Sequence, residues 1–313
     1  MCCFNGFNPN NYVGRFAPSP TGPLHFGSLV AAVGSYLDAR SHGGQWLVRM
    51  EDVDTPRCIP GAAADILRTL ELFGFEWDGP LVEQSQRLGT YRDALDDLLQ
   101  RGLAYPCTCS RKEIVESGAV DAIDGGRVYP GFCREGLRHS EPSRQRAWRL
   151  KVADDPIGFI DRLLGEQTQL LGQAVGDFVL LRADGLFAYQ LAVVVDDAWQ
   201  GVTDVVRGAD LLTSTARQIW LQRCLGVPTP RYAHLPLVVN SLGEKLSKQT
   251  LAPALIPAQA ATQLVEALRF LGQAVPEGLV QSGLAAVWEW AFVNWDIRNL
   301  AHFTASPIAG QGD

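Results

Sequence analysis

The stretch that decides the fold is Tyr12-Val-Gly-Arg-Phe-Ala-Pro-Ser-Pro-Thr-Gly-Pro-Leu-His-Phe-Gly-Ser28. Its first six residues are typical of a β-strand, and the prolines and glycine after them predict an irregular turn. Beyond the turn, apolar residues recur at helical spacing: Leu29, Val30, Val33, Tyr36 and Leu37. We therefore expect a strand, a turn and a helix that begins near Leu24.

The start of this helix is a candidate ATP site. The first N–H groups of a helix have no partner inside the helix and carry partial positive charge, so phosphate oxygens bind there readily. His25 adds a hydrogen-bond donor, and Gly27 allows a nucleotide to approach the backbone. Taken alone, the prolines and the glycine before a helix are equally typical of an ordinary structural turn.

The amino-acid composition limits the classes of protein to which the chain can belong. With 313 residues, of which 47% are hydrophobic and 19% charged, the chain can bury a large core in two or three subdomains. A basic segment followed by an apolar run is missing at the N-terminus, and we expect a cytoplasmic protein without a membrane partner. The net charge of −7 argues against broad non-specific binding of nucleic acid but allows a local basic face.

The rest of the chain alternates between strand and helix patterns, which predicts an α/β fold with a doubly wound parallel sheet. Strands are expected at 46–50, 178–181, 186–195, 202–206 and 234–240, and helices at 62–73, 91–99, 215–225 and from 258 onward. Glu51 and Arg207 each follow a predicted strand. Because open α/β sheets bind ligands at the carboxyl ends of their strands, both residues are candidates for the site.

Three cysteines form a candidate metal site. They lie in Tyr105-Pro-Cys107-Thr-Cys109 and in Tyr129-Pro-Gly-Phe-Cys133, two short segments that suit tetrahedral Zn²⁺. The fourth ligand is open between Tyr129 and His139. A zinc ion held entirely by protein ligands would be structural, and the alternative is three unrelated buried cysteines.

Two further segments are basic. Residues 134–155 contain Arg134, Arg138, Arg144, Arg146, Arg149 and Lys151, which form either a solvated face or a contact with an RNA backbone. Lys245 and Lys248 lie in Ser241-Leu-Gly-Glu-Lys-Leu-Ser-Lys-Gln249, which in isolation is typical of a solvated turn.

Taken together, these motifs resemble the class I aminoacyl-tRNA synthetases in their glutamate-specific form. The string Arg15-Phe-Ala-Pro-Ser-Pro-Thr-Gly22 resembles the start of the family's "HIGH" signature, with Ser28 in place of its last histidine. The Ser241–Gln249 segment resembles the "KMSKS" loop, with Leu246 for the methionine and Gln249 for the final serine. The resemblance covers about residues 12–300.

The resemblance implies a role for each matched residue. Glutamate would be bound by Arg15, Phe16, Ala17, Pro18, Ser19, Glu51, Tyr189 and Arg207, with Glu51 on the α-ammonium. Mg²⁺-ATP would be bound by His25, Gly27, Ser28 and Lys248, and the catalytic residues would be His25, Lys245 and Lys248. The zinc ligands would be Cys107, Cys109, Tyr129 and Cys133, since the related glutamyl-Q synthetases have a tyrosine four residues before the last cysteine.

Two arginines make chemical sense in a site for glutamate. A guanidinium binds a carboxylate through two parallel hydrogen bonds, and the amide of glutamine cannot supply both acceptors. Leaving such buried donors unpaired costs the wrong substrate on the order of 10⁴-fold. We therefore expect glutamate rather than glutamine as the substrate.

The resemblance also implies an organisation. Residues 1–104 would form the first half of a Rossmann-like catalytic domain, 105–192 an inserted zinc-containing α+β subdomain, 193–256 the second half with the lysine loop, and 257–313 a short helical region. Full glutamyl-tRNA synthetases continue into an anticodon-reading domain, and only 64 residues follow Gln249 of the lysine loop here. This difference and the cysteine pattern make the chain similar to the glutamyl-Q tRNA(Asp) synthetases.

The expected function follows from that similarity. The chain would activate L-glutamate with ATP and transfer it, as a monomer, to the cyclopentenediol of queuosine in tRNA(Asp). The alternatives are a truncated synthetase that charges the 3′ end of tRNA(Glu), a catalytically inactive, zinc-stabilised RNA-binding paralogue, and an adenylyl transferase with a small-molecule product.

Overall fold

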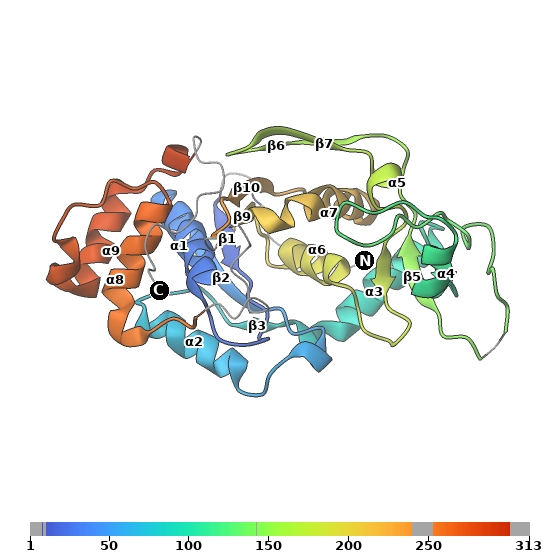
Figure 1. Cartoon of the computed structure of the whole chain (residues 1–313), viewed down its shortest axis with the longest axis horizontal. Coiled ribbons are helices and arrows are strands. Elements are labelled where there is room, and N and C mark those ends of the chain that lie inside the picture. The colour runs from blue at the N-terminus through green and yellow to red at the C-terminus, as the bar shows by residue number, and fades with distance from the viewer. Residues whose placement is uncertain (1–7, 9–10, 142, 240–252, 301–313) are drawn as a thin grey trace.

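The computed structural model describes residues 8, 11–141, 143–239 and 253–300. The described strands form three sheets, with helices packed around them (Figure 1). A parallel sheet of order β1-β2-β3 contains β1 (Val13–Phe16), β2 (Gln45–Met50) and β3 (Val82–Glu83). The alternation of strand and helix in this part confirms the predicted α/β class.

The first half of the structure is built on the opening stretch of sequence. Helix α1 (Phe26–Ser41) follows β1, and His25 caps its N-terminus in an extended backbone conformation. Most of α1 is buried, because the parallel strands lie on one side of it and later helices on the other. Helices α2 (Ala62–Leu72) and α3 (Leu88–Gln100) complete this half, close to the predicted ranges.

The second half adds two more parallel strands. Strands β9 (Asp204–Gly208) and β10 (Arg231–Leu235) pair in parallel, and α7 (Leu212–Leu225) connects them. The Thr203 N–H donates to the Val13 carbonyl at 3.0 Å, so β9 begins beside β1. Segments about 190 residues apart thus meet at the centre of the molecule, where Figure 1 shows β1, β9 and β10 together.

An antiparallel unit lies at one end of the molecule. It contains β4 (Ala104–Cys107), β5 (Ala147–Leu150) and β8 (Val179–Leu181), with the short helices α4 (Arg111–Glu116) and α5 (Leu171–Ala174). The hairpin of β6 (Ile157–Asp161) and β7 (Gly165–Gln169) reaches back, and β6 pairs with β10. The four-part division of the chain stays a proposal, and helix α6 (Tyr189–Trp199) runs through its boundary at residue 192.

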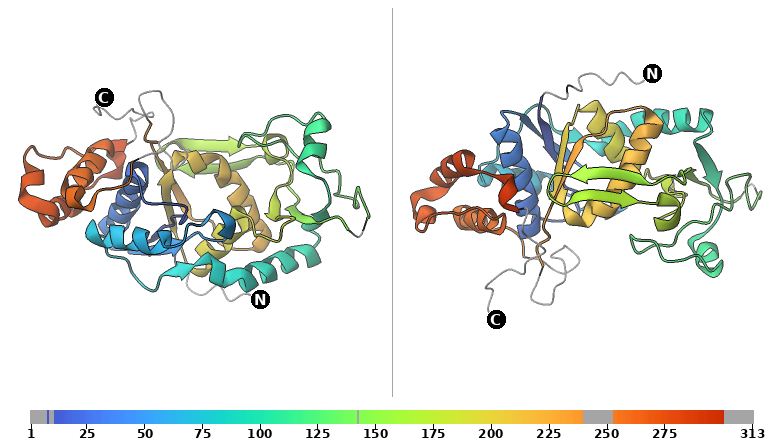
Figure 2. Two further views of the ribbon diagram at one scale, coloured as in Figure 1. Left: turned by 60° about the horizontal axis from the view of Figure 1, so that its bottom comes forward. Right: turned by 90° about the horizontal axis from the view of Figure 1, so that it is seen from above.

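The C-terminal helices cover the opposite end. Helices α8 (Ala260–Phe270) and α9 (Gly283–Asn294) lie beside α1 in both views of Figure 2. Trp288 of α9 packs against Tyr36 and Phe75, and its indole N–H donates to the Phe73 carbonyl at 2.8 Å. The predicted C-terminal helical region therefore belongs to the same core as the first parallel strands.

One predicted strand is wrong. Residues 186–195 were expected to form a strand, but Tyr189 begins α6, which is buried along almost its whole length. An apolar run between turns fits a buried helix as well as a buried strand, since periodicity does not separate the two. The predicted strand at 234–240 also differs, because β10 begins at Arg231 and ends at Leu235.

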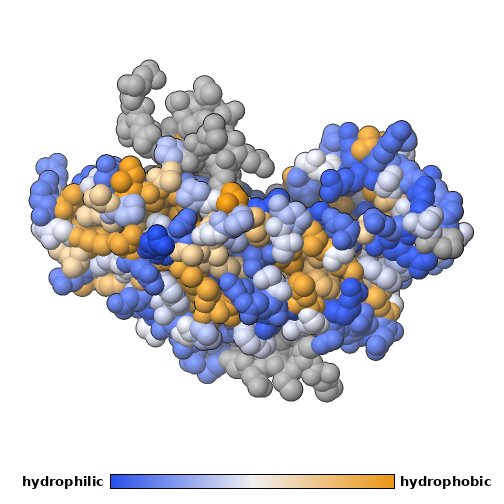
Figure 3. Space-filling model, turned by 90° about the horizontal axis from the view of Figure 1, so that it is seen from below, coloured by the Kyte–Doolittle hydropathy of each residue, from blue (hydrophilic) through white to orange (hydrophobic). Residues whose placement is uncertain are grey.

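The surface is mixed in character. Figure 3 shows hydrophilic and hydrophobic side chains interspersed on the face seen from below. In the described part of the chain, every helix is too short or too polar to cross a membrane.

Candidate active site

A pocket of about 510 Å³ opens where the two parallel halves meet. Its walls come from the β1–α1 turn, the residue after β2, the start of α6, the end of β9 and the segment after β10. All the predicted glutamate-binding and ATP-binding residues that the structure describes line it: Arg15, Phe16, Ala17, Pro18, Ser19, His25, Gly27, Ser28, Glu51, Tyr189 and Arg207. Residues that are far apart in the sequence thus share one cavity.

The predicted catalytic residues Lys245 and Lys248 lie outside the described residues. The chain on either side of their segment is described, and both sides reach the pocket. Val238 lines the pocket, and the Leu255 N–H donates to the Leu24 carbonyl at 2.9 Å. The described residues on the two sides of the segment therefore lie at the pocket wall and beside the start of α1.

His25 is organised by the helix that it caps. Its Nδ1 accepts a hydrogen bond from the Ser28 N–H at 3.3 Å. In a neutral imidazole the other nitrogen then carries the proton, so Nε2 is the donor. Ser28 makes this contact through its backbone N–H. The contact therefore does not require the histidine side chain that the signature has at position 28.

Arg15 and Arg49 share the carboxylate of Asp197. Arg15 Nε lies 3.2 Å from Asp197 Oδ1, and an Arg49 terminal nitrogen lies 2.8 Å from the same oxygen. All three side chains are at most 9% exposed. Burial raises the pKa of Asp197, but the two guanidinium groups outweigh it and lower the pKa below its usual value. Asp197 therefore fixes Arg15 at the pocket wall.

Glu51 belongs to the same network. Its carboxylate accepts from Arg49 at 3.2 Å, and its side chain is 9% exposed. Burial raises the pKa of Glu51, while Arg49 and Arg15 oppose the shift. A substrate ammonium next to this carboxylate would favour its ionised form.

Asp196 lies behind the pocket, next to the network of Arg15, Arg49 and Asp197. It accepts hydrogen bonds from Gln84, Arg87 and Tyr91, at 2.9, 2.7 and 2.7 Å. Arg87 in turn lies over the ring of Trp199, with its Cζ 3.8 Å from the ring centroid. Asp196 and Asp197 thus both anchor α6, and they share Arg49 as a partner.

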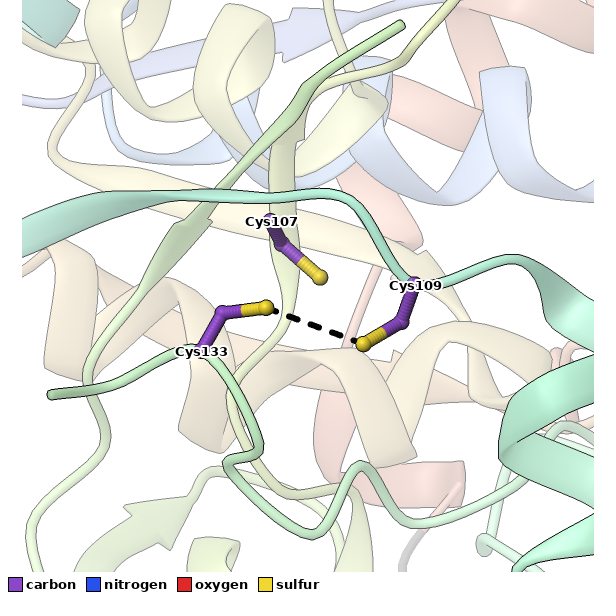
Figure 4. Close-up of side chains that lie close together, drawn as sticks. All are labelled: Cys107, Cys109 and Cys133. Atoms are coloured by element: carbon purple, nitrogen blue, oxygen red, sulfur yellow. Dashed lines mark hydrogen bonds between the residues drawn. The ribbon is translucent and has the colours of Figure 1, made fainter. Parts of the chain in front are cut away.

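The three predicted cysteine ligands converge. The sulfur atoms of Cys107, Cys109 and Cys133 all lie within 4.8 Å of one another, and Figure 4 shows the three side chains pointing toward a common centre. Burial raises the pKa of the Cys133 thiol, but hydrogen bonds, first from the Arg138 N–H, outweigh it and lower the pKa to about 7. Such a cluster suits Zn²⁺, which binds thiolates.

Tyr129, rather than His139, lies with the sulfur atoms. The Tyr129 hydroxyl is 3.3 Å from the sulfur of Cys107 and 3.6 Å from that of Cys109. The Nε2 atom of His139 lies 2.9 Å from a carboxylate oxygen of Glu113 instead. The donor set of three thiols and one phenol fits a four-coordinate metal.

The basic run at 134–155 is largely engaged inside the protein. Arg134 pairs with Asp177 at 2.6 Å, Arg144 pairs with Glu113 at 3.1 Å, and Arg149 donates to the Asp177 carbonyl at 2.7 Å. These contacts do not favour the interpretation of the run as a free RNA-binding face.

Sequence reasoning missed the residues behind the pocket. Arg49, Asp161 and His234 are almost fully buried and hold the pocket arginines or their neighbours. The available signal was a charged or titratable residue inside an otherwise apolar strand pattern.

Comparison with known proteins identifies the family. Residues 12–294 match the family model described as tRNA synthetases class I (E and Q), catalytic domain. The chain therefore belongs to the class I tRNA synthetases of the glutamate and glutamine group, and the predicted fold is confirmed.

Individual relatives show to which group within the family the chain belongs. A glutamyl-Q tRNA(Asp) synthetase of Dechloromonas aromatica is 67% identical over 91% of this chain and 94% of its own length. One of Chromobacterium violaceum is 57% identical over 95% of this chain and 97% of its own length. The chain belongs to the glutamyl-Q tRNA(Asp) synthetases.

Solved structures agree with the fold. A glutamate-tRNA synthetase from Elizabethkingia anophelis has a TM-score of 0.76 and 26% identity over 96% of this chain and 68% of its own. A glutamate tRNA ligase from Elizabethkingia meningosepticum, solved in complex with its amino acid, matches equally well over 67% of its own chain.

Proposed function

We propose that this chain activates L-glutamate with Mg²⁺-ATP and transfers it to the cyclopentenediol of queuosine in tRNA(Asp). The observation that carries the proposal is the pocket, in which Arg15 and Arg207 lie in one cavity with the N-terminal end of α1. The similarity to glutamyl-Q tRNA(Asp) synthetases over nearly the whole chain supports the choice of acceptor.

The first step is attack by the α-carboxylate of glutamate on the α-phosphate of ATP, which releases pyrophosphate and forms glutamyl-adenylate. Such a step depends on positioning and on the stabilisation of phosphate charge. The Nε2–H of His25 and the start of α1 act on the phosphates, and Gly27 leaves room for the nucleotide. Lys248 and Lys245 add positive charge to the departing pyrophosphate.

The amino-acid side of the pocket selects glutamate. Arg15 and Arg207 bind the side-chain carboxylate, and Glu51 binds the α-ammonium. Burial raises the pKa of Tyr189, which keeps its phenol protonated as a further donor. Phe16, Ala17, Pro18 and Ser19 form the wall beside the amino acid.

The second step is an ester transfer. A hydroxyl of the queuosine cyclopentenediol attacks the carbonyl carbon of glutamyl-adenylate, the new C–O bond forms, and AMP leaves with the phosphate oxygen. The hydroxyl proton passes to the departing phosphate or to water.

The cysteine cluster has a structural role. Zn²⁺ would be held by Cys107, Cys109, Tyr129 and Cys133, and it would tie the end of β4 to the 129–133 segment. All four positions would be filled by protein, so the metal takes no part in glutamate activation.

The experiment is glutamylation of tRNA(Asp) with and without queuosine. We expect labelled glutamate on the queuosine-containing tRNA alone, and nuclease mapping that assigns the label to the anticodon fragment. Equal labelling of both tRNAs, or label at the 3′ end of tRNA(Glu), would contradict the proposal and indicate a truncated glutamyl-tRNA synthetase.

A further inference from the structure

Arg207 is held in place by hydrogen bonds to three protein groups. Its Nε donates to His234 Nε2 at 3.2 Å, and one terminal nitrogen donates to Thr215 Oγ1 at 2.9 Å and to the Leu211 carbonyl at 3.3 Å. Arg207 is only 5% exposed. The guanidinium is therefore fixed along one edge.

The other terminal nitrogen of Arg207, Nη1, is buried and has no hydrogen-bond partner in the described part of the chain, although Arg207 lines the pocket. A buried donor without a partner destabilises a protein, and the penalty is larger for a charged group. An anionic ligand in the pocket is the partner that would remove this cost.

His234 supplies the acceptor for Arg207 because of a second buried contact. Its Nδ1 lies 2.6 Å from Asp161 Oδ2, and both side chains are fully buried. Asp161 also accepts from the Leu163 and Leu164 N–H groups, both at 3.0 Å. A carboxylate requires a donor opposite it, so the imidazole proton belongs on Nδ1 and Nε2 keeps its lone pair.

The environment favours this neutral form. Burial lowers the pKa of His234 and the Arg207 charge lowers it further, although Asp161 acts in the opposite direction. The pKa of Asp161 is itself below its usual value, because the hydrogen bonds from His234 and from the two N–H groups outweigh its burial.

We propose that His234 is a positioning residue for glutamate recognition: Asp161 fixes its tautomer, and its Nε2 orients Arg207 so that Nη1 faces the substrate carboxylate. The identity of the carboxylate as that of glutamate rests on the proposed function. Asp161, on β6, thereby acts on the pocket through two intermediate side chains.

Two amide variants separate the two contacts of the ring. In His234→Gln the amide oxygen reaches the position of Nε2 and still accepts from Arg207. In His234→Asn the shorter amide reaches only the position of Nδ1, so the contact with Asp161 stays and the contact with Arg207 is lost. Both variants bury one amide, and each keeps one of the two contacts of the ring.

The kinetic readout is glutamate-dependent exchange of pyrophosphate into ATP. We expect His234→Asn to raise the KM for glutamate about tenfold, as for loss of a charge-assisted hydrogen bond, with kcat and the KM for ATP unchanged. His234→Gln stays within about threefold of wild type. His42→Asn, the same change at an exposed histidine outside the pocket, serves as the control. Equal glutamate KM values for the two His234 variants would overturn the inference.

A second readout does not depend on activity. Two-bond ¹H–¹⁵N correlation spectra of the wild-type protein distinguish a protonated ring nitrogen from a bare one. We expect His234 with a protonated Nδ1 and a bare Nε2, and the opposite tautomer would overturn the inference. A wild-type protein without glutamate-dependent exchange would instead refute the proposed function, and the spectrum would still decide whether His234 accepts from Arg207.

Discussion

The Nε atom of Arg15 lies 3.2 Å from Oδ1 of Asp197, although the two residues are 182 positions apart in the chain. Arg15 lies in β1, and Asp197 lies near the end of α6. The ion pair therefore joins β1 to α6 behind the pocket. It couples the stability of the fold to the geometry of the site.

Asp197→Asn should weaken both fold and function. It leaves Arg15 and Arg49 buried without their shared charge, and breaking such a pair typically costs about 3–5 kcal/mol. We expect a loss of this order in the free energy of unfolding, measured in urea, and at least a tenfold increase in the KM for glutamate. Asp97→Asn, in an exposed pair with Arg101, should cost less than about 1 kcal/mol. Equal effects of the two substitutions would contradict the role of Asp197.

Lys248→Ala should abolish glutamate-dependent pyrophosphate exchange while the protein stays folded. Loss of one donor that stabilises charge in a transition state typically costs a factor of about 10²–10³ in kcat. The far-UV circular dichroism spectrum and the unfolding midpoint should match those of wild type. Lys112→Ala, at an exposed lysine of α4, is the control. Near-normal exchange by Lys248→Ala would remove this lysine from the mechanism.

Tyr129→Phe should weaken metal binding without emptying the core around the ring. The variant keeps the aromatic packing and removes the hydroxyl that lies beside the sulfur atoms. We expect an affinity for Zn²⁺ at least tenfold lower, measured by competition with a chromophoric chelator, and a lower unfolding temperature after removal of the metal.

Two controls belong to the metal experiment. Cys58→Ser, at a free cysteine away from the cluster, should leave one bound Zn²⁺. His139→Ala should also keep the metal. An unchanged affinity in Tyr129→Phe together with a loss in His139→Ala would mean that the histidine is the fourth ligand.

Gly74→Ala should be more destabilising than Gly102→Ala. Both glycines follow a helix with positive φ, +79° and +68°, where an alanine costs roughly 1–2 kcal/mol. Only at Gly74 would the new Cβ also meet the Trp288 Nε1 atom, at 2.8 Å, and disturb its hydrogen bond to Phe73. We expect the difference in unfolding free energy to exceed about 1 kcal/mol. Equal losses of unfolding free energy in the two variants would mean that α9 moves away from the new Cβ at no energetic cost.

The sequence predicted the front of the pocket better than its support. The proline-rich turn, the start of the first helix, Glu51 and Arg207 each follow from local patterns, and the structure brings them into one cavity. The helix that begins at Tyr189 was predicted as a strand. A continuous run of apolar residues shows neither the helical nor the strand periodicity, so it does not distinguish a buried helix from a buried strand.

The buried polar partners could not be predicted for a different reason. Asp161, Asp197 and His234 meet their partners only through tertiary contacts between elements far apart in the chain. Similarly, Tyr129 and His139 are equivalent candidates by spacing, and only the folded positions bring the phenol to the cysteines.

The most direct measurement is the structure of the protein in complex with a non-hydrolysable analogue of glutamyl-adenylate. The account predicts one ligand in the pocket, with Arg15 and Arg207 both within hydrogen-bonding distance of its side-chain carboxylate and the adenylate phosphate at His25 and the start of α1. An analogue bound with its carboxylate away from both arginines, or its phosphate away from α1, would contradict it.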